Sequence, residues 1–167
     1  MMNVREGKAM YYIPLNISSS YSLLQSTLRV EDIKNYAEEK ELPAVALSDH
    51  GVMYACIDFY QTMKASDINP VIGSALTCRL TADGSVTIDC SCYAKNYRGY
   101  QQLLALVNAC QLGEASLSIQ DILKKSEDLI LVFALQSTKV DENPCQDFRP
   151  VLDILSVVER LVYLGID

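Results

Sequence analysis

Short apolar runs that alternate with longer amphipathic stretches are the main pattern along this chain. The clearest strand signal follows the turn-forming residues 82–84, where Val86, Ile88, Cys90 and Cys92 alternate with polar residues. A period of two is typical of a strand with one buried face. From such patterns, strands are predicted over residues 11–18, 44–47, 71–80, 86–93, 129–135 and 161–166.

Helical spacing marks the stretches between these strands. In residues 30–40, Ile33, Tyr36 and Ala37 recur at intervals of three and four, which places them on one face of a helix. The residues from Ser118 to Asp121 resemble a capping box, which opens a helix. Helices are predicted over residues 30–40, 52–66, 100–107 and 151–160, with a short helix after Ser118 and a loop over residues 136–148.

The order of these elements sets the expected fold class. Short buried strands that alternate with amphipathic helices predict an α/β fold, with a parallel sheet, outer helices and one inserted antiparallel hairpin over residues 71–93. We expect residues 1–10 to be an N-terminal extension and residues 11–167 to form one domain. The last predicted strand has no covering helix after it, so we expect the domain to be truncated at its C-terminus.

Charge and composition narrow the range of functions. The 167 residues carry a formal net charge of −7, and the 14 basic residues are scattered along the chain. Strong nucleic-acid binding needs clustered basic residues, so it is not expected of this chain alone. Residues 1–8 are polar, and no apolar run reaches the ~18 residues that span a bilayer. We therefore expect a cytoplasmic protein with reduced thiols and no membrane segment.

Two sets of side chains could carry chemistry by themselves. Cys90 and Cys92 could form a soft-metal pair, but the alternation puts both sulfurs on the apolar face, where cysteine packs as a small hydrophobe. The serines in residues 18–22 could supply a nucleophile, which needs an adjacent base, and His50 is the only histidine. We expect core packing for the two cysteines and a solvated loop for the serines.

A series of short motifs follows in a fixed order along most of the chain. These motifs are Tyr21-Ser22-Leu23-Leu24, Val30-Glu31-Asp32-Ile33, Leu42 through Gly51 with Ser48-Asp49-His50-Gly51 at its end, Asp58-Phe59-Tyr60, Ile68 through Gly73, Tyr93-Ala94-Lys95-Asn96, Gly99-Tyr100, and Leu103-Leu104 with Leu106-Val107. In this order and spacing they resemble the N-terminal PHP domain of the alpha subunit of bacterial DNA polymerase III. No single motif is specific, so the resemblance rests on the series.

The resemblance implies a distorted seven-stranded (β/α) barrel, similar to a TIM barrel, of which this chain would hold a part. Barrels of this kind carry their chemistry at the C-terminal ends of the strands. In active relatives a cluster of His, Asp and Glu there holds zinc or manganese ions and hydrolyses phosphoesters. The polymerase palm of the alpha subunit, which uses magnesium, would lie outside this chain.

Most positions of the implied metal site have lost their ligands here. The His-x-His pair of the family falls on Asn16 and Ser18, its next aspartate on Gln25, and its glutamate on Ala75. A zinc site needs at least three protein ligands, and amide, hydroxyl and methyl groups are poor substitutes for imidazole and carboxylate. We therefore expect no metal, no cofactor and no catalytic residue in this fragment.

Asp49 and His50 are the only remnants of the family's ligand set. Both also have structural interpretations. Asp49 could cap the helix that follows near Val52, which is worth ~1 kcal/mol, and His50-Gly51 could be an ordinary turn. The loss of the other ligands favours these structural roles.

Three functions remain open at this point. A non-catalytic scaffold domain would brace the rest of a replicative polymerase alpha subunit and contact replisome accessory subunits. A stand-alone metal-dependent phosphoesterase, such as a relative of histidinol phosphatase, would be rescued by Mn²⁺ or Zn²⁺. An interaction module would use the open strand edges of an incomplete barrel, so we expect self-association or a loop that masks the edge. The missing ligands favour the scaffold.

Overall fold

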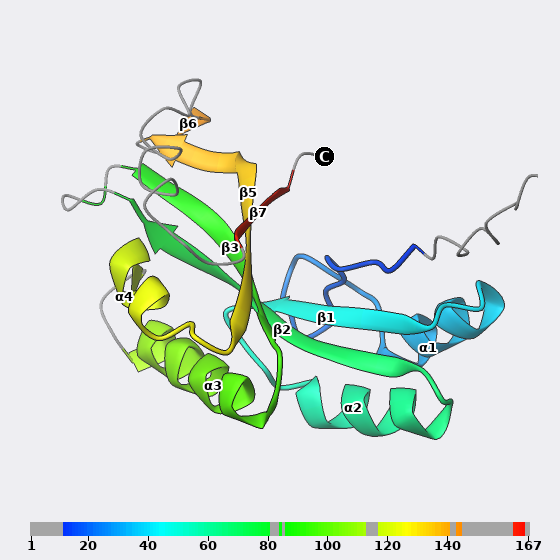
Figure 1. Ribbon diagram of the computed structural model, residues 1–167. Helices are drawn as coiled ribbons and strands as arrows, with labels where there is room; N and C mark the ends of the chain where they lie inside the picture. The colour runs from blue at the N-terminus through cyan, green and yellow to red at the C-terminus, as the bar shows by residue number, and fades with distance from the viewer. Residues whose placement is uncertain are drawn as a thin grey trace, which may run out of the picture.

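A computed structural model of the chain describes residues 12–80, 84, 86–112, 117–140, 143–144 and 162–165 (Figure 1). They form an α/β fold, as the alternating pattern predicts. In chain order the elements are α1 (Val30–Glu39), β1 (Ala44–His50), α2 (Cys56–Ala65), β2 (Asn69–Arg79), β3 (Val86–Ala94), α3 (Tyr97–Leu112), β4 (Leu117–Ser118), α4 (Ile119–Lys124), β5 (Leu129–Val140), β6 (Asn143–Pro144) and β7 (Val162–Gly165).

One mixed sheet contains all the described strands. Its main path runs β1-β2-β3-β5-β6, with β4 added to β2 and β7 added to β5. The pair β1 and β2 is parallel, as is the pair β5 and β7, whereas β3 is antiparallel to both β2 and β5. The expectation of a parallel sheet was therefore only partly correct. The unexpected pair is β3 with β5. Because β3 runs opposite to β2 after the short turn and β5 again runs in the direction of β2, the two strands meet in the antiparallel sense.

The strand predicted over residues 11–18 is wrong for the part that the structure describes. Residues 12–18 form no regular strand, although their chain follows the outer edge of β1. The Ala46 amide donates to the carbonyl of Pro14 over 3.2 Å, and the Ser48 amide donates to that of Ile17 over 2.7 Å. The two donors are two residues apart and the two acceptors are three apart, so the register slips and a regular ladder cannot form.

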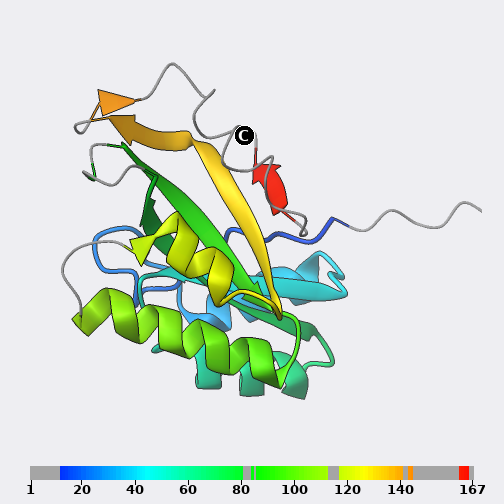
Figure 2. The same ribbon diagram turned by 60° about the vertical axis from the view of Figure 1, so that its left-hand side comes forward.

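The four helices pack on one face of the sheet (Figures 1 and 2). Two apolar clusters fill the space between the helices and the sheet, and the partly buried Ile72 of β2 contacts both. The first cluster contains Val30, Ile33, Ala37, Val45, Leu47, Phe59 and Met63. The second contains Leu76, Cys78, Ile88, Cys90, Cys92, Leu103, Leu106, Ile122, Leu131 and Phe133.

The C-terminal part departs from the sequence prediction in one respect. Residues 136–140, predicted as loop, continue β5, and Asn143–Pro144 forms β6. Backbone pairing of Val140 with Val86 and of Lys139 with Thr87 extends the strand despite its polar sequence. The last predicted strand is confirmed as β7, whereas the helix predicted over residues 151–160 lies outside the described residues.

In the part of the chain that the structure describes, no helix is both long enough and apolar enough to cross a membrane.

Candidate functional site

The C-terminal end of β1 places Asp49 and His50 on opposite faces of the sheet. Successive side chains of a strand alternate between faces, so His50 joins the face away from the helices and Asp49 joins the helix-covered face. Across the sheet, His50 is registered with Ala75 of β2, and Ala75 is registered with Ser91 of β3. The side chains of Asp49 and His50 therefore lie in two separate environments.

On the face away from the helices, His50 is the first member of a hydrogen-bonded chain. Its Nε2 lies 3.3 Å from Oγ1 of Thr77, and that hydroxyl donates to Oδ1 of Asp89 over 2.7 Å. A hydroxyl has one hydrogen, which Thr77 gives to Asp89, so Thr77 accepts a hydrogen bond from His50. His50 therefore carries a proton on Nε2. We call these three residues the His50 chain.

On the helix-covered face, the carboxylate of Asp49 is buried and its oxygens accept three hydrogen bonds. Its Oδ1 accepts from the Ser19 amide over 2.6 Å and from the Ser22 hydroxyl over 2.8 Å, and its Oδ2 accepts from the Ser19 hydroxyl over 2.8 Å. Asp49 is 1% exposed. Hydrogen bonds to a carboxylate are stronger than those between neutral groups. We call Asp49, Ser19 and Ser22 the Asp49 cluster.

Asp49 does not cap the following helix, which corrects one of its two structural interpretations. Helix α2 begins at Cys56, and its N-cap residue Ala55 provides no side-chain cap. The carboxylate instead holds the loop that precedes α1. The other interpretation fits the structure in part: His50 is the last residue of β1, and the chain bends at Gly51, which has a φ of 68°. That left-handed conformation favours glycine, and the Gly51 amide still donates to the carbonyl of Ala75 of β2 over 2.8 Å.

The expectation of solvated serines in this loop is correct only in part. Ser20 is exposed and Ser18 is half-buried, whereas Ser19 and Ser22 are buried. The Ser22 hydroxyl also accepts a hydrogen bond from the His50 amide over 3.1 Å. Thr77 and Asp89 were also missed as site residues. The strand period could have found Asp89, because it alternates with core residues such as Cys90. No sequence signal shows that Asp49 turns toward the serines, since this depends on how residues 12–22 fold over β1.

The four positions at which the resemblance implies further ligands are only partly brought together. Gln25 and His50 line the same small pocket, and Ala75 is the registered neighbour of His50. Ser18 directs its hydroxyl to the carbonyl of Ser48 over 3.1 Å, and Asn16 is exposed. The side chain of Asn16 is therefore in solvent, that of Gln25 lies in a pocket wall, and that of Ser18 bonds to a backbone carbonyl.

These residues do not fit a catalytic metal centre. Such a site needs about three imidazole or carboxylate ligands that converge on one point. His50 and the carboxylate of Asp49 lie on opposite faces of the sheet, and the Asp49 oxygens already accept three hydrogen bonds. Within the described ranges, no group of three or more His, Cys, Asp and Glu side chains is arranged to hold a metal.

The cysteine pair of β3 belongs to the apolar core, as the alternation predicted. Cys90 and Cys92 are fully buried, and their sulfurs lie 3.8 Å apart as free thiols. Burial raises the pKa of Cys90 well above its ordinary value, helped by hydrogen bonds with Cys78 and Cys92. A thiol held in its neutral form is a poor metal ligand. Cys145 lies outside the described residues.

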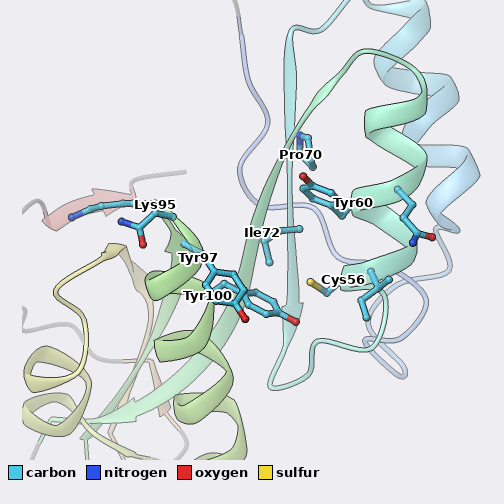
Figure 3. A pocket seen from close by; sticks show the side chains of 11 residues that line it. Cys56, Tyr60, Pro70, Ile72, Lys95, Tyr97 and Tyr100 are labelled. Atoms are coloured by element: carbon cyan, nitrogen blue, oxygen red, sulfur yellow. The ribbon is translucent and has the colours of Figure 1, made fainter.

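A second cavity, of about 550 Å³, lies between α2 and α3 above β2 (Figure 3). Tyr97 and Tyr100 of α3 face Cys56 of α2 across it, and Ile72 forms its floor (Figure 3). Burial raises the pKa of the Cys56 thiol, and a hydrogen bond with Tyr100 opposes this effect. The only charged residue in the wall, Lys95, directs its ammonium group away from the tyrosines, 3.3 Å from the carbonyl of Glu127. This cavity is apolar and offers no acid–base pair.

Comparisons with known proteins agree with the motif series. The family profile of the PHP domain matches residues 14–147. DNA polymerase III subunit alpha of Ureaplasma parvum is 41% identical over 93 residues, which cover 56% of this chain and 9% of that protein. The corresponding subunits of Halalkalibacterium halodurans and Bacillus subtilis are 31% and 37% identical, over 72% and 61% of this chain and over 11% and 9% of their own lengths.

This chain spans about a tenth of the length of the curated relatives it matches. Among solved structures, a protein from Bifidobacterium adolescentis described as a metal-dependent phosphoesterase superimposes with a TM-score of 0.56 at 12% identity, covering 93% of this chain and 86% of that one. At this identity the likeness concerns the fold alone. The profile match over most of the chain, together with the alpha-subunit relatives, shows that the chain belongs to the PHP domain family.

Proposed function

We propose that this chain is a non-catalytic scaffold domain of a replicative DNA polymerase III alpha subunit. The observation that carries the proposal is the state of the Asp49 carboxylate. It is 1% exposed and its oxygens already accept three hydrogen bonds from Ser19 and Ser22. A hydrolytic metal site needs several imidazole and carboxylate ligands that are free to converge on one ion. The domain holds no metal and no cofactor of its own.

The scaffold role follows from what the site retains. The mixed sheet and its outer helices are intact, whereas the side chains at the strand ends serve the fold. DNA synthesis then belongs to the polymerase palm of the alpha subunit, which this domain braces, together with contacts to replisome accessory subunits in the cytoplasm. We further propose that the sheet is part of a distorted seven-stranded barrel in which β2 and β3 form an inserted hairpin.

The competing function is a metal-dependent phosphoesterase, the activity attributed to the structural neighbour from Bifidobacterium adolescentis. The purified chain is dialysed against Zn²⁺ or Mn²⁺, analysed for bound metal, and assayed on p-nitrophenyl phosphate. We expect substoichiometric metal, and a hydrolysis rate equal to that of the matched variant His50→Ala. Stoichiometric metal and phosphate release that both disappear in His50→Ala would establish the phosphoesterase and exclude the scaffold role.

The proposal also concerns the partners of the domain. With a net charge of −7 and scattered basic residues, the chain alone binds DNA weakly and extends no primer. Its partner surfaces are protein surfaces: the remainder of an alpha subunit, and a second copy of the chain when the domain is isolated. Primer extension by the purified chain would contradict this assignment.

A further inference from the structure

The loop before α1 and the loop before α2 together expose four large apolar or aromatic side chains. Leu23 is 80% exposed, Leu24 is fully exposed, and Tyr21 and Tyr54 are 49% and 72% exposed. The two tyrosine rings meet edge to face with their centroids 6.2 Å apart, so the two loops form one surface. Clustered exposed apolar side chains mark interaction sites, whereas scattered ones do not. We call these four residues the loop face.

Hydrogen bonds of the Asp49 cluster hold the part of the loop face that precedes α1. Ser22, which bonds to Asp49, also accepts backbone hydrogen bonds at its carbonyl from Gln25 over 3.0 Å and from Ser26 over 3.2 Å. Leu24, inside this turn, has a φ of 63°, which is unfavourable for a leucine. A strained residue with a fully exposed apolar side chain gains nothing from the domain itself, which points to a role in binding. A rigid loop loses little conformational entropy on binding.

A pocket of about 240 Å³ adjoins the loop face. Leu23 and Tyr21 belong to both the face and the pocket wall, which His50 and Gln25 complete on the polar side. The pocket is large enough for a leucine side chain. Because Leu24 lies between two residues of the pocket wall, a two-fold axis through this one patch can place Leu24 of each copy in the pocket of the other, which is the geometry of a symmetric dimer.

The open edge of β1 is less suited to self-association than the loop face. The outward amides of β1 are already used, because Ala46 and Ser48 donate to the chain of residues 14–17 and His50 donates to Ser22. Edge-to-edge pairing through β1 is therefore blocked. The loop face and its pocket contain no Asp, Glu, Lys or Arg, so two copies of an acidic protein can meet there without direct like-charge contacts.

We propose that the loop face binds a second copy of this chain in a two-fold dimer, with Leu24 of each copy in the pocket of the other. The proposal deepens the self-association proposed above, and rests on it. Small specific interfaces bury about 600 Å² per partner. Four side chains per copy bury no more area than this, so the dimer is weak. Because the chain is acidic, the dimer tightens as salt screens the repulsion between copies.

The test measures the oligomeric state of the purified chain by sedimentation equilibrium. Protein concentrations from about 5 to 300 μM cover the weak dimers that a small interface is expected to form. We expect a monomer–dimer equilibrium that Leu24→Asp weakens at least tenfold. The matched control is Leu112→Asp, at a site on α3 that is 89% exposed, and it should change the dissociation constant less than twofold.

A second variant separates binding from folding. Leu24→Gly removes the side chain and suits the positive φ, so urea unfolding should show equal or higher stability while the dimer weakens at least tenfold. A strict monomer at 300 μM overturns the proposal and leaves the loop face to the remainder of an alpha subunit. An equal loss of dimer in Leu24→Asp and Leu112→Asp overturns it as well. Neither outcome affects the scaffold role, which the metal and hydrolysis assays test.

Discussion

Asp49 and His50 are adjacent in the sequence and belong to one motif, yet they lie in contrasting environments. Asp49 is buried on the helix-covered face, where its carboxylate accepts three hydrogen bonds. His50 is half-buried on the opposite face and has one side-chain hydrogen-bond partner, Thr77. The difference shows that a motif within a strand always divides its residues between two faces, so adjacency in sequence is no evidence for a shared site.

The two regions also differ in how much their polar groups contribute to stability. A buried carboxylate that satisfies three donors leaves all three unpaired when it is removed. A half-buried chain such as that of His50 can replace its partners with water. The comparison can be tested by making equivalent substitutions in the two regions.

The largest effect is expected for Asp49→Ala. It leaves the Ser19 amide and the hydroxyls of Ser19 and Ser22 without their acceptor in a buried site, so the free energy of unfolding should fall by about 3–5 kcal/mol in urea titrations. The matched control Asp89→Ala removes the same group from the half-buried His50 chain and should cost less than about 1 kcal/mol. Equal costs for the two variants would remove the distinction between the two regions.

An intermediate effect is expected for Tyr93→Phe, which removes a contact to the segment of residues 12–22 that contains Ser19 and Ser22. The Tyr93 hydroxyl donates to the carbonyl of Leu15 over 2.6 Å, and burial raises its pKa, so it remains a protonated donor. Its removal should cost about 1 kcal/mol and accelerate amide exchange in residues 12–22. Tyr36→Phe on the exposed side of α1 is the control. Unchanged exchange in Tyr93→Phe would show that the segment is held by other contacts.

The smallest effect is expected for Thr77→Val, which removes the hydroxyl between His50 and Asp89. Stability should change by less than about 1 kcal/mol, because the site is half-exposed. The ¹⁵N resonances of His50 should change instead, since the protein with Thr77 fixes the proton on Nε2 and the variant allows both neutral tautomers. A histidine spectrum that is identical in the two proteins would contradict the hydrogen-bonded chain.

The sequence predicts where strands lie more reliably than it predicts which strands pair with one another. The alternation from Val86 to Cys92 identified β3 and its buried face, because a period of two depends only on local side chains. Local side-chain patterns could not identify the extension of β5 to Val140. That extension depends on pairing with Val86, which is distant in the sequence. The prediction over residues 11–18 failed because Pro14 and the register slip are decided by contacts with β1.

The geometry of the site could not be predicted from the sequence. The resemblance names Asn16, Ser18, Gln25 and Ala75 as positions of the implied ligands, and their replacement stays a prediction. The burial of Ser19 and Ser22 around Asp49 could not be predicted, because polar serines in a loop usually indicate solvent exposure. Only the fold of residues 12–22 over β1 brings these groups together.

The hydroxyl of Ser18 limits what a histidine at this position would achieve. It donates to the carbonyl of Ser48 at the rim of β1 over 3.1 Å. A Ser18→His substitution would supply the imidazole that the resemblance implies, but it has to place a ring where a hydroxymethyl group now fits, and it loses that bond. The Asp49 carboxylate already accepts three hydrogen bonds, so it is not free to join the new imidazole. A metal site here would therefore need several substitutions at once, together with a rearranged loop.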